Sequence, residues 1–181
     1  MRKVVAAINL TIDGFCDHTA GIADEEIHDH YTALLNNSDV ILYGRTTYEL
    51  MQFWQTLLEK PSGEQSMDDF AKAIDRIPKI IFSTTLKDTG WNTATLADEP
   101  LKETVLKLKQ QSGGDILIGC RSLIVALANL NLIDEYQLCI HPVIIGKGLP
   151  LFDQINERTV FKLLKTKIFG AGATLLYYQR A

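Results

Sequence analysis

The chain has 181 residues, a formal net charge of −4, and 46% hydrophobic and 22% charged residues. This length suits one domain, which we expect to span residues 1–181, and the composition argues against a disordered chain. No apolar run approaches the roughly 20 residues that a membrane-spanning helix needs, and the dispersed basic residues argue against nucleic-acid binding.

Three cysteines are spread along the sequence, at Cys16, Cys120 and Cys139. Their spacing fits no metal site, and an odd number argues against a disulfide framework. We therefore expect a cytoplasmic protein without a metal. Asp24 and His28 stand one helical turn apart and could bind a metal, but the pattern is more typical of a solvated helix start.

The N-terminal third predicts two strands and two helices. Residues 2–12 form an apolar strand; a signal peptide is the alternative, but the apolar part is short and runs into Asp13 and Gly14. Apolar positions at a helical spacing follow over 24–37, and residues 40–43 form a buried strand. The next helix is predicted over 46–58, with an apolar face made of Met51, Trp54, Leu57 and Leu58.

The middle third alternates in the same way. A loop over 59–66 and a helix over 67–75 precede the strand that starts "KIIF" at residue 79. Residues 91–96 form a weak strand. Pro100 is well placed to begin a helix, with Asp98 as its cap. Two glycines end that helix, and a fourth buried strand follows over residues 115–119.

The last third changes character. A helix over 121–130 leads into a long strand over 134–145, "DEYQLCIHPVII". Two further strands, 161–169 and 173–179, are predicted to form an antiparallel pair. Strands that alternate with helices and then pair predict an α/β fold. We expect a mostly parallel central sheet, helices on both faces and an antiparallel C-terminal hairpin.

Polar residues follow four of the predicted strands, where sheets of this kind bind ligands. Backbone N–H groups at helix starts, hydroxyls and guanidiniums suit phosphates, and several such strand ends suit a dinucleotide. Neither GxGxxG nor a P-loop is present. The residues are Thr11 and Asp13; Gly44, Arg45, Thr46 and Thr47; Ser83 and Thr84; and Gly119, Cys120, Arg121 and Ser122.

Several of these residues also have a simpler interpretation. Thr46 or Thr47 fits equally well as a helix cap, and Ser83 with Thr84 as ordinary turn residues. Gly119 is also explained by a tight strand-to-helix turn. Asp13 is explained by a turn with Gly14. Their recurrence at successive strand ends is what favours a binding site.

Two segments resemble a known superfamily. "DVILYGRTTYE" (39–49) is similar to the strand-to-helix segment of dihydrofolate reductases. The forty residues 113–152, "GGDILIGCRS…GLPLF", resemble the reductase domain of the bifunctional riboflavin-biosynthesis deaminase/reductase, and "TIDGF" (11–15) fits the same group. The resemblance implies a dihydrofolate reductase-like three-layer α/β fold, NADPH as cofactor and a homodimer.

The resemblance also implies positions for the cofactor. Ala7 would lie beside the nicotinamide, and residues 44–47 at the pyrophosphate and adenosine. Arg45 with Ser83 and Thr84 would bind the 2′-phosphate. The loop from Gly119 through Cys120, Arg121 and Ser122 to Leu123 would lie against the pyrophosphate and nicotinamide ribose. Family members commonly have consecutive glycines there, so Cys120 and Arg121 depart from the pattern; Arg121 could instead pair with a phosphate.

The implied reaction is that of 5-amino-6-(5-phosphoribosylamino)uracil reductase, hydride transfer from NADPH to the ribose C1′ of a phosphoribosylaminopyrimidine. Thr11 and Asp13 would bind the substrate, with Asp13 ordering substrate or water beside C1′. Lys147 in the "GKG" turn could pair with the substrate phosphate, although an exposed turn lysine is usually solvated.

Two other functions stay open. Dihydrofolate reductases place one carboxylate on the first helix, facing the pteridine, and this segment offers Asp24, Glu25, Glu26 and Asp29. A non-catalytic nucleotide-binding protein of the same fold is the other alternative, and the changed loop at Cys120 favours it slightly. For the homodimer, the long apolar strand over 134–145 is the expected contact, since pairing or packing across a two-fold axis would protect it; the alternative is a strand covered by the chain's own helices.

Overall fold

A single eight-stranded sheet organises the chain. The computed structural model describes all residues from Met1 to Ala181. The strand order is β4-β3-β2-β5-β1-β6-β8-β7; strands β1 to β6 run parallel, and β8 pairs antiparallel with β6 and β7. The strands are β1 (Val4–Thr11), β2 (Ser38–Gly44), β3 (Lys79–Phe82), β4 (Ala94–Leu96), β5 (Asp115–Ile118), β6 (Glu135–His141), β7 (Phe161–Ile168) and β8 (Thr174–Arg180). This confirms the predicted fold class.

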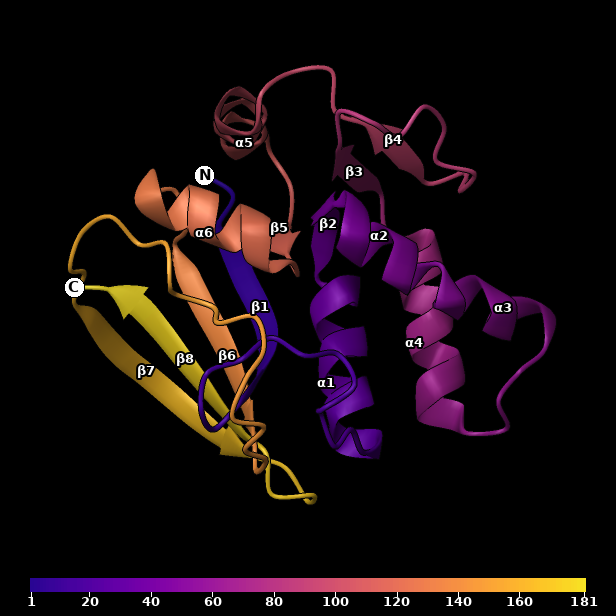
Figure 1. Ribbon diagram of the computed structural model, residues 1–181. Helices are drawn as coiled ribbons and strands as arrows, with labels where there is room; N and C mark the ends of the chain where they lie inside the picture. Colours follow the sequence, from indigo (N-terminus) through magenta and orange to yellow (C-terminus); the bar gives the residue numbers. More distant parts are fainter.

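Six helices cover the sheet: α1 (Glu25–Asn36), α2 (Arg45–Met51), α3 (Phe53–Glu59), α4 (Gln65–Arg76), α5 (Leu101–Gln110) and α6 (Arg121–Asn129). The connections through α1 and α4 move along the sheet in one direction, and those through α5 and α6 move in the other. Right-handed crossovers therefore place the two sets on opposite faces, as Figure 1 shows. None of the helices is both long enough and apolar enough to cross a membrane.

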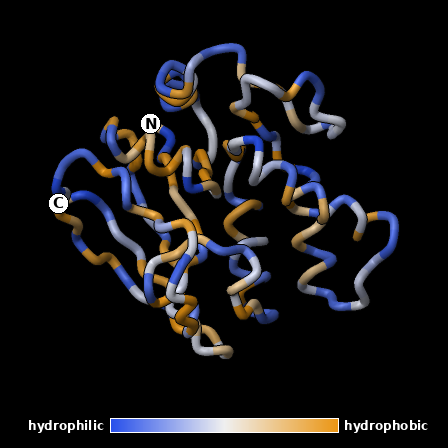
Figure 2. Tube along the Cα trace, in the orientation of Figure 1, coloured by the Kyte–Doolittle hydropathy of each residue, from blue (hydrophilic) through white to orange (hydrophobic).

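The core lies where the parallel strands are covered on both faces. Every residue of β1 is buried except Asn9, and Val40 to Tyr43 of β2 are buried as well. Figure 2 shows the same division, with apolar colours along the inner strands and polar colours along many outer loops. These strands consist largely of Val, Ile and Leu because helices cover both faces of a parallel sheet and bury the side chains on each face.

The helix predicted over 46–58 is wrong in one respect, since the chain forms two helices there, α2 and α3, that meet at Gln52. Their packing partners differ. In α2, Tyr48 is fully buried and its hydroxyl donates to the carbonyl of Thr89 at 2.6 Å, whereas α3 packs on α4. One straight axis cannot serve both contacts, and the Gln52 side chain bridges to Thr89 at the break.

The strand predicted over 134–145 is shorter than expected. Strand β6 ends at His141, because Pro142 has no N–H to continue the ladder. It lies between β1 and β8, so its backbone is paired on both sides. The strand therefore has no free edge with which a partner chain could pair; the edge strands are β4 and β7.

Several element boundaries differ from the prediction. The predicted cap at Asp98 is wrong: α5 has Pro100 at its N-cap position and no side-chain cap. Helix α4 is longer than the predicted 67–75, and β4 covers only the end of the predicted 91–96. Trp91 is buried instead, with its ring under the ammonium group of Lys79 at 4.1 Å.

Candidate functional site

The carboxyl ends of β1, β2, β3 and β5 meet at one edge of the sheet. Beyond β2 and β5 the chain leaves on opposite faces, toward α2 and α6, and such a divergence opens a crevice between two strands. The two loops contact each other directly, because the N–H of Gly44 donates to Sγ of Cys120 at 3.2 Å. Residues that are 76 positions apart in the sequence thus form one site.

The first part of this site is the start of α2. Gly44 occupies the N-cap position, and no side chain caps the helix. Because the helix begins at Arg45, one residue before the predicted start, neither Thr46 nor Thr47 acts as a cap. Arg45 and Thr46 are exposed. The capping interpretation of the two threonines is therefore wrong, and Thr46 faces solvent.

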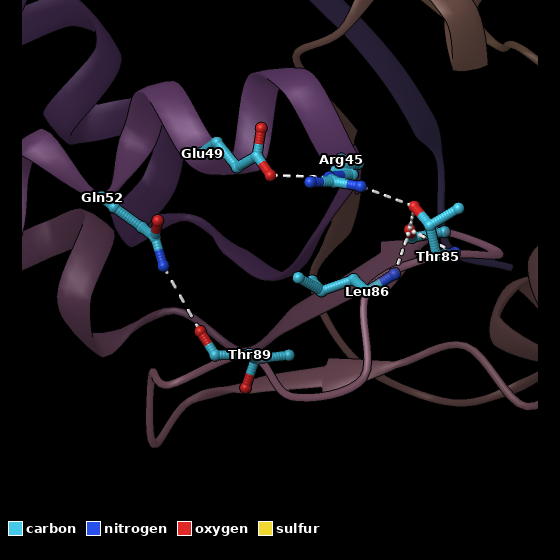
Figure 3. Close-up of polar contacts among 7 residues, drawn as sticks. Arg45, Glu49, Gln52, Thr85, Leu86 and Thr89 are labelled. Carbon is cyan, nitrogen blue, oxygen red and sulfur yellow. Dashed lines mark hydrogen bonds and ion pairs between the residues drawn. The ribbon is translucent and has the colours of Figure 1, made fainter.

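Arg45 lines a groove at the ends of β2, β3 and β4. Figure 3 shows its guanidinium between Glu49, which accepts from Nε at 2.6 Å, and Thr85, whose hydroxyl accepts from Nη1 at 2.7 Å. The groove has a volume of about 550 Å³, and its polar lining comprises Arg45, Ser83, Thr84, Thr85 and Glu99. Glu99 forms an ion pair with Lys107.

Ser83 has a structural role at the rim of this groove. Its Oγ accepts from the N–H groups of Thr85, at 3.2 Å, and Leu86, at 3.0 Å. It is therefore a turn residue, as one interpretation held, and it also stands in the same groove as Arg45 and Thr84. Thr85, which also follows this strand, was not among the expected cofactor residues, although its hydroxyl is the one that holds Arg45.

Strand β5 is followed by a residue without a side chain, Gly119. A Cβ atom on Gly119 would lie 3.3 Å from the ring of Tyr43 and 3.9 Å from the carbonyl oxygen of Ala7. Gly119 therefore sits between β2 and β1, and Ala7 is its neighbour across the sheet. A side chain at this position would be crowded by Tyr43, so the close packing of β1, β2 and β5 here favours glycine.

The residues after Gly119 are differently engaged. The thiol of Cys120 is buried, and burial raises its pKa, so that it stays protonated at neutral pH. The guanidinium of Arg121 donates to the carbonyl of Pro150 and forms an ion pair with Asp153. An Arg121–phosphate contact would require this pair to open. Ser122 contacts the Cys120 sulfur at 3.9 Å.

Leu123, the last residue of the predicted cofactor loop, is buried in the main core. Its side chain therefore does not line the crevice.

Asp13, beyond the end of β1, fastens one loop to another. Its carboxylate accepts the N–H groups of Ile145, at 3.2 Å, and Gly146, at 2.7 Å. Hydrogen bonding by the Thr11 side chain and by these N–H groups lowers the pKa of Asp13, which is ionised at neutral pH. Thr11 is buried, and its hydroxyl accepts from the N–H of Phe15 at 3.0 Å.

The acidic start of α1 has a capping function. Asp24 accepts the N–H of Ile27 at 2.9 Å with one oxygen and that of Ala171 at 2.8 Å with the other. The structure brings together no group of three or more potential metal-binding His, Cys, Asp or Glu side chains.

A second polar group was missed from the sequence. Asn9, Tyr31 and His141 come from β1, α1 and the end of β6, and the oxygen of the Asn9 amide joins them. The signal was present, since Asn9 is a polar residue within an otherwise apolar strand. Its meaning depended on knowing that β6 lies beside β1.

Comparison with known proteins places this fold. The model of the RibD C-terminal domain matches residues 2–175 of the chain. The chain belongs to the RibD C-terminal domain family. Its similarity extends to the protein YyaP of Bacillus subtilis (strain 168), described as uncharacterized, which is 34% identical over 98% of this chain and 94% of that protein.

Solved structures show the same architecture. A putative riboflavin biosynthesis protein from Shewanella sp. PV-4 superposes with a TM-score of 0.74 at 19% identity, over 100% of this chain and 99% of that one. The Thermotoga maritima deaminase and 5-amino-6-(5-phosphoribosylamino)uracil reductase gives 0.65 at 16%, over 99% and 57%. Enterococcus faecalis dihydrofolate reductase complexed with NADP(H) gives 0.63 at 13%, over 98% and 96%. The RibD C-terminal fold is thus a dihydrofolate reductase-like fold.

Proposed function

We propose that the chain is an NADPH-dependent reductase of the riboflavin-biosynthesis type. Its family and the reductases among its structural neighbours support this class of reaction. The observation that carries the proposal is the edge where the loops that begin at Gly44 and Gly119 contact each other, next to Arg45, whose side chain lines a polar groove. The proposed substrate is a phosphoribosylaminopyrimidine, or a related small molecule, that accepts hydride at the ribose C1′.

The residues at this edge fit NADPH. Arg45, Ser83 and Thr84 would hold the 2′-phosphate, and the loops at Gly44 and Gly119 would accommodate the pyrophosphate. The ion pair of Arg45 with Glu49 is half-exposed, and such pairs contribute about 0–1 kcal/mol, so a phosphate can replace it at little cost. When bound, the cofactor supplies the hydride, and the chain contributes position and the exclusion of water.

A folate substrate fits the structure less well. Two acidic residues at the start of α1 make structural hydrogen bonds: Asp24 caps the helix, and Glu26 accepts the N–H of Gly170 at 2.8 Å. Glu25 and Asp29 are exposed. The buried side of α1 carries Ile27 instead, so no carboxylate of this helix faces the sheet.

The test of the proposed function is NADPH oxidation with each substrate. We expect turnover with 5-amino-6-(5-phosphoribosylamino)uracil, and turnover with 7,8-dihydrofolate instead would establish the folate reductase. Quenching of Trp fluorescence by NADPH is expected for either enzyme. Tight binding of NADPH with turnover of neither substrate would point to a different carbonyl or imine substrate. Absence of NADPH binding would point to a non-catalytic protein.

Asp13 is proposed to order the substrate or its water. Its carboxylate is ionised and exposed, and it holds the turn that carries Lys147, so it can accept a hydrogen bond but not supply a proton. We expect Asp13→Asn to lower kcat/KM and to leave the Kd of NADPH unchanged, measured by kinetics and fluorescence titration. An equal loss in cofactor affinity would assign Asp13 to the cofactor site or to the fold.

A homodimer is proposed on the edge strand β7. This strand pairs only with β8, and it exposes Leu163, Leu164 and Ile168. A second copy would cover these side chains and the unpaired backbone. We expect sedimentation equilibrium to give twice the chain mass, and Leu164→Lys to give the single mass. A single mass for the unchanged protein would contradict the proposal.

A further inference from the structure

One polar side chain interrupts the buried face of the central strand β1. The strand lies between β5 and β6, yet Asn9 is exposed while its neighbours along the strand are buried. Side chains two residues apart share a strand face, so Asn9 lies on the face of Ala7. Ala7 borders Gly119, where the nicotinamide is proposed to lie. An accessible amide therefore stands beside the proposed reaction centre.

The position of the proton on His141 follows from its hydrogen bonds. Nδ1 accepts the N–H of Ile22 at 3.0 Å, so this nitrogen carries no proton. Burial lowers the pKa of His141 and keeps the ring neutral at neutral pH, and a neutral imidazole then carries its proton on Nε2. Nε2 lies 3.1 Å from Oδ1 of Asn9 and therefore donates to it.

Tyr31, on helix α1, makes the second hydrogen bond to the Asn9 amide. Its hydroxyl, on α1, donates to the same Oδ1 of Asn9 at 2.9 Å. Both lone pairs of this oxygen are thus used. If the amide exchanged its oxygen and nitrogen, Nδ2 would face the N–H of His141 and that bond would be lost, so His141 fixes the orientation of the amide. No protein atom accepts a hydrogen bond from Nδ2 of Asn9, although that nitrogen has two N–H groups to donate.

We propose that Asn9 recognises the substrate, donating from Nδ2 to an uncharged acceptor such as a ring carbonyl oxygen. The proposal rests on the proposed function and deepens it. The groups bonded to Asn9, Tyr31 and His141, are neutral, so this position suits the pyrimidine ring and not the phosphate. Asn9 contacts the substrate, and Tyr31 and His141 are positioning residues.

The first test is steady-state kinetics with NADPH and 5-amino-6-(5-phosphoribosylamino)uracil. Asn9→Leu keeps a similar volume but removes both donors, and we expect kcat/KM to fall about tenfold, with the Kd of NADPH unchanged. Tyr31→Phe keeps the ring and removes one bond that orients the amide, so a smaller loss is expected. The matched control, Asn92→Leu, makes the same change on an exposed loop residue and should change neither constant. An unchanged kcat/KM in Asn9→Leu would overturn the proposal while the proposed function stands.

The second test does not depend on turnover. The ¹⁵N-labelled side-chain amide of Asn9 is followed by NMR while uracil, the ring alone, is added to the protein with NADP⁺. We expect its cross-peak to move with uracil and to stay in place with adenosine 2′-phosphate. If the unchanged enzyme does not oxidise NADPH, the proposed function fails for that substrate, and this titration still decides the role of Asn9. A cross-peak unmoved by saturating uracil would refute that role.

Discussion

Replacing Gly119 by valine is expected to weaken NADPH binding about 100-fold. A Cβ atom at this position already lies 3.3 Å from the ring of Tyr43, which is tighter than an ordinary contact. The two added methyl groups must therefore point into the crevice beside Ala7 or displace Tyr43. Overpacking of this kind costs about 1–3 kcal/mol, and the upper end corresponds to this factor. Fluorescence titration with NADPH measures it.

The controls separate a blocked site from a damaged fold. Gly119→Ala adds only the Cβ atom and should lose much less affinity. Gly170→Val makes the full change at the β7–β8 hairpin, where the nearest atoms to a Cβ are the carboxylate oxygens of two acidic side chains at 3.7 Å, and should bind NADPH normally. If Gly119→Val binds NADPH as the unchanged protein does, while its melting temperature is also unchanged, the cofactor does not approach Gly119.

Replacing Arg45 by alanine is expected to lower the affinity for NADPH selectively. The guanidinium is held over the groove by Glu49 and Thr85, and in the proposal it turns to the 2′-phosphate. Loss of a charge-assisted contact costs about 1–3 kcal/mol, or roughly 5- to 150-fold in Kd. NADH has no 2′-phosphate, so its Kd should stay the same. Titration with both cofactors measures the difference.

Two further variants sharpen this experiment. Glu49→Gln removes the carboxylate that competes for Arg45, and we expect NADPH affinity to stay equal or to rise. Arg121→Ala removes a guanidinium that pairs with Asp153, so we expect a lower melting temperature and no selective loss of NADPH over NADH. An equal loss of NADPH and NADH in Arg45→Ala would remove its assignment to the 2′-phosphate.

The fold was predictable because its central strands are continuous apolar runs in the sequence. The run from Val40 to Tyr43 and the apolar residues of β1 are buried on both faces, which a continuous apolar sequence indicates directly. The break at Gln52 was not predictable, because it follows from a change of packing partner and not from a breaking residue. The place of β6 inside the sheet depends on strand order, which local sequence does not encode.

The candidate site was predictable to the extent that it is made of strand ends. Arg45 and Ser83 were expected together and share one groove, because parallel strands end at the same edge. The partner of Arg121 could not be predicted, since Asp153 is brought near only by the loop after β6. The role of Asn9 could not be predicted, because it depends on hydrogen bonds to two residues distant in the sequence, Tyr31 and His141.

The most direct test of the account is a crystal structure with NADPH soaked in. We expect density that runs from the groove at Arg45, past the loops at Gly44 and Gly119, to a nicotinamide ring beside Ala7. An edge that stays empty at saturating NADPH, or a cofactor bound elsewhere on the molecule, would contradict it.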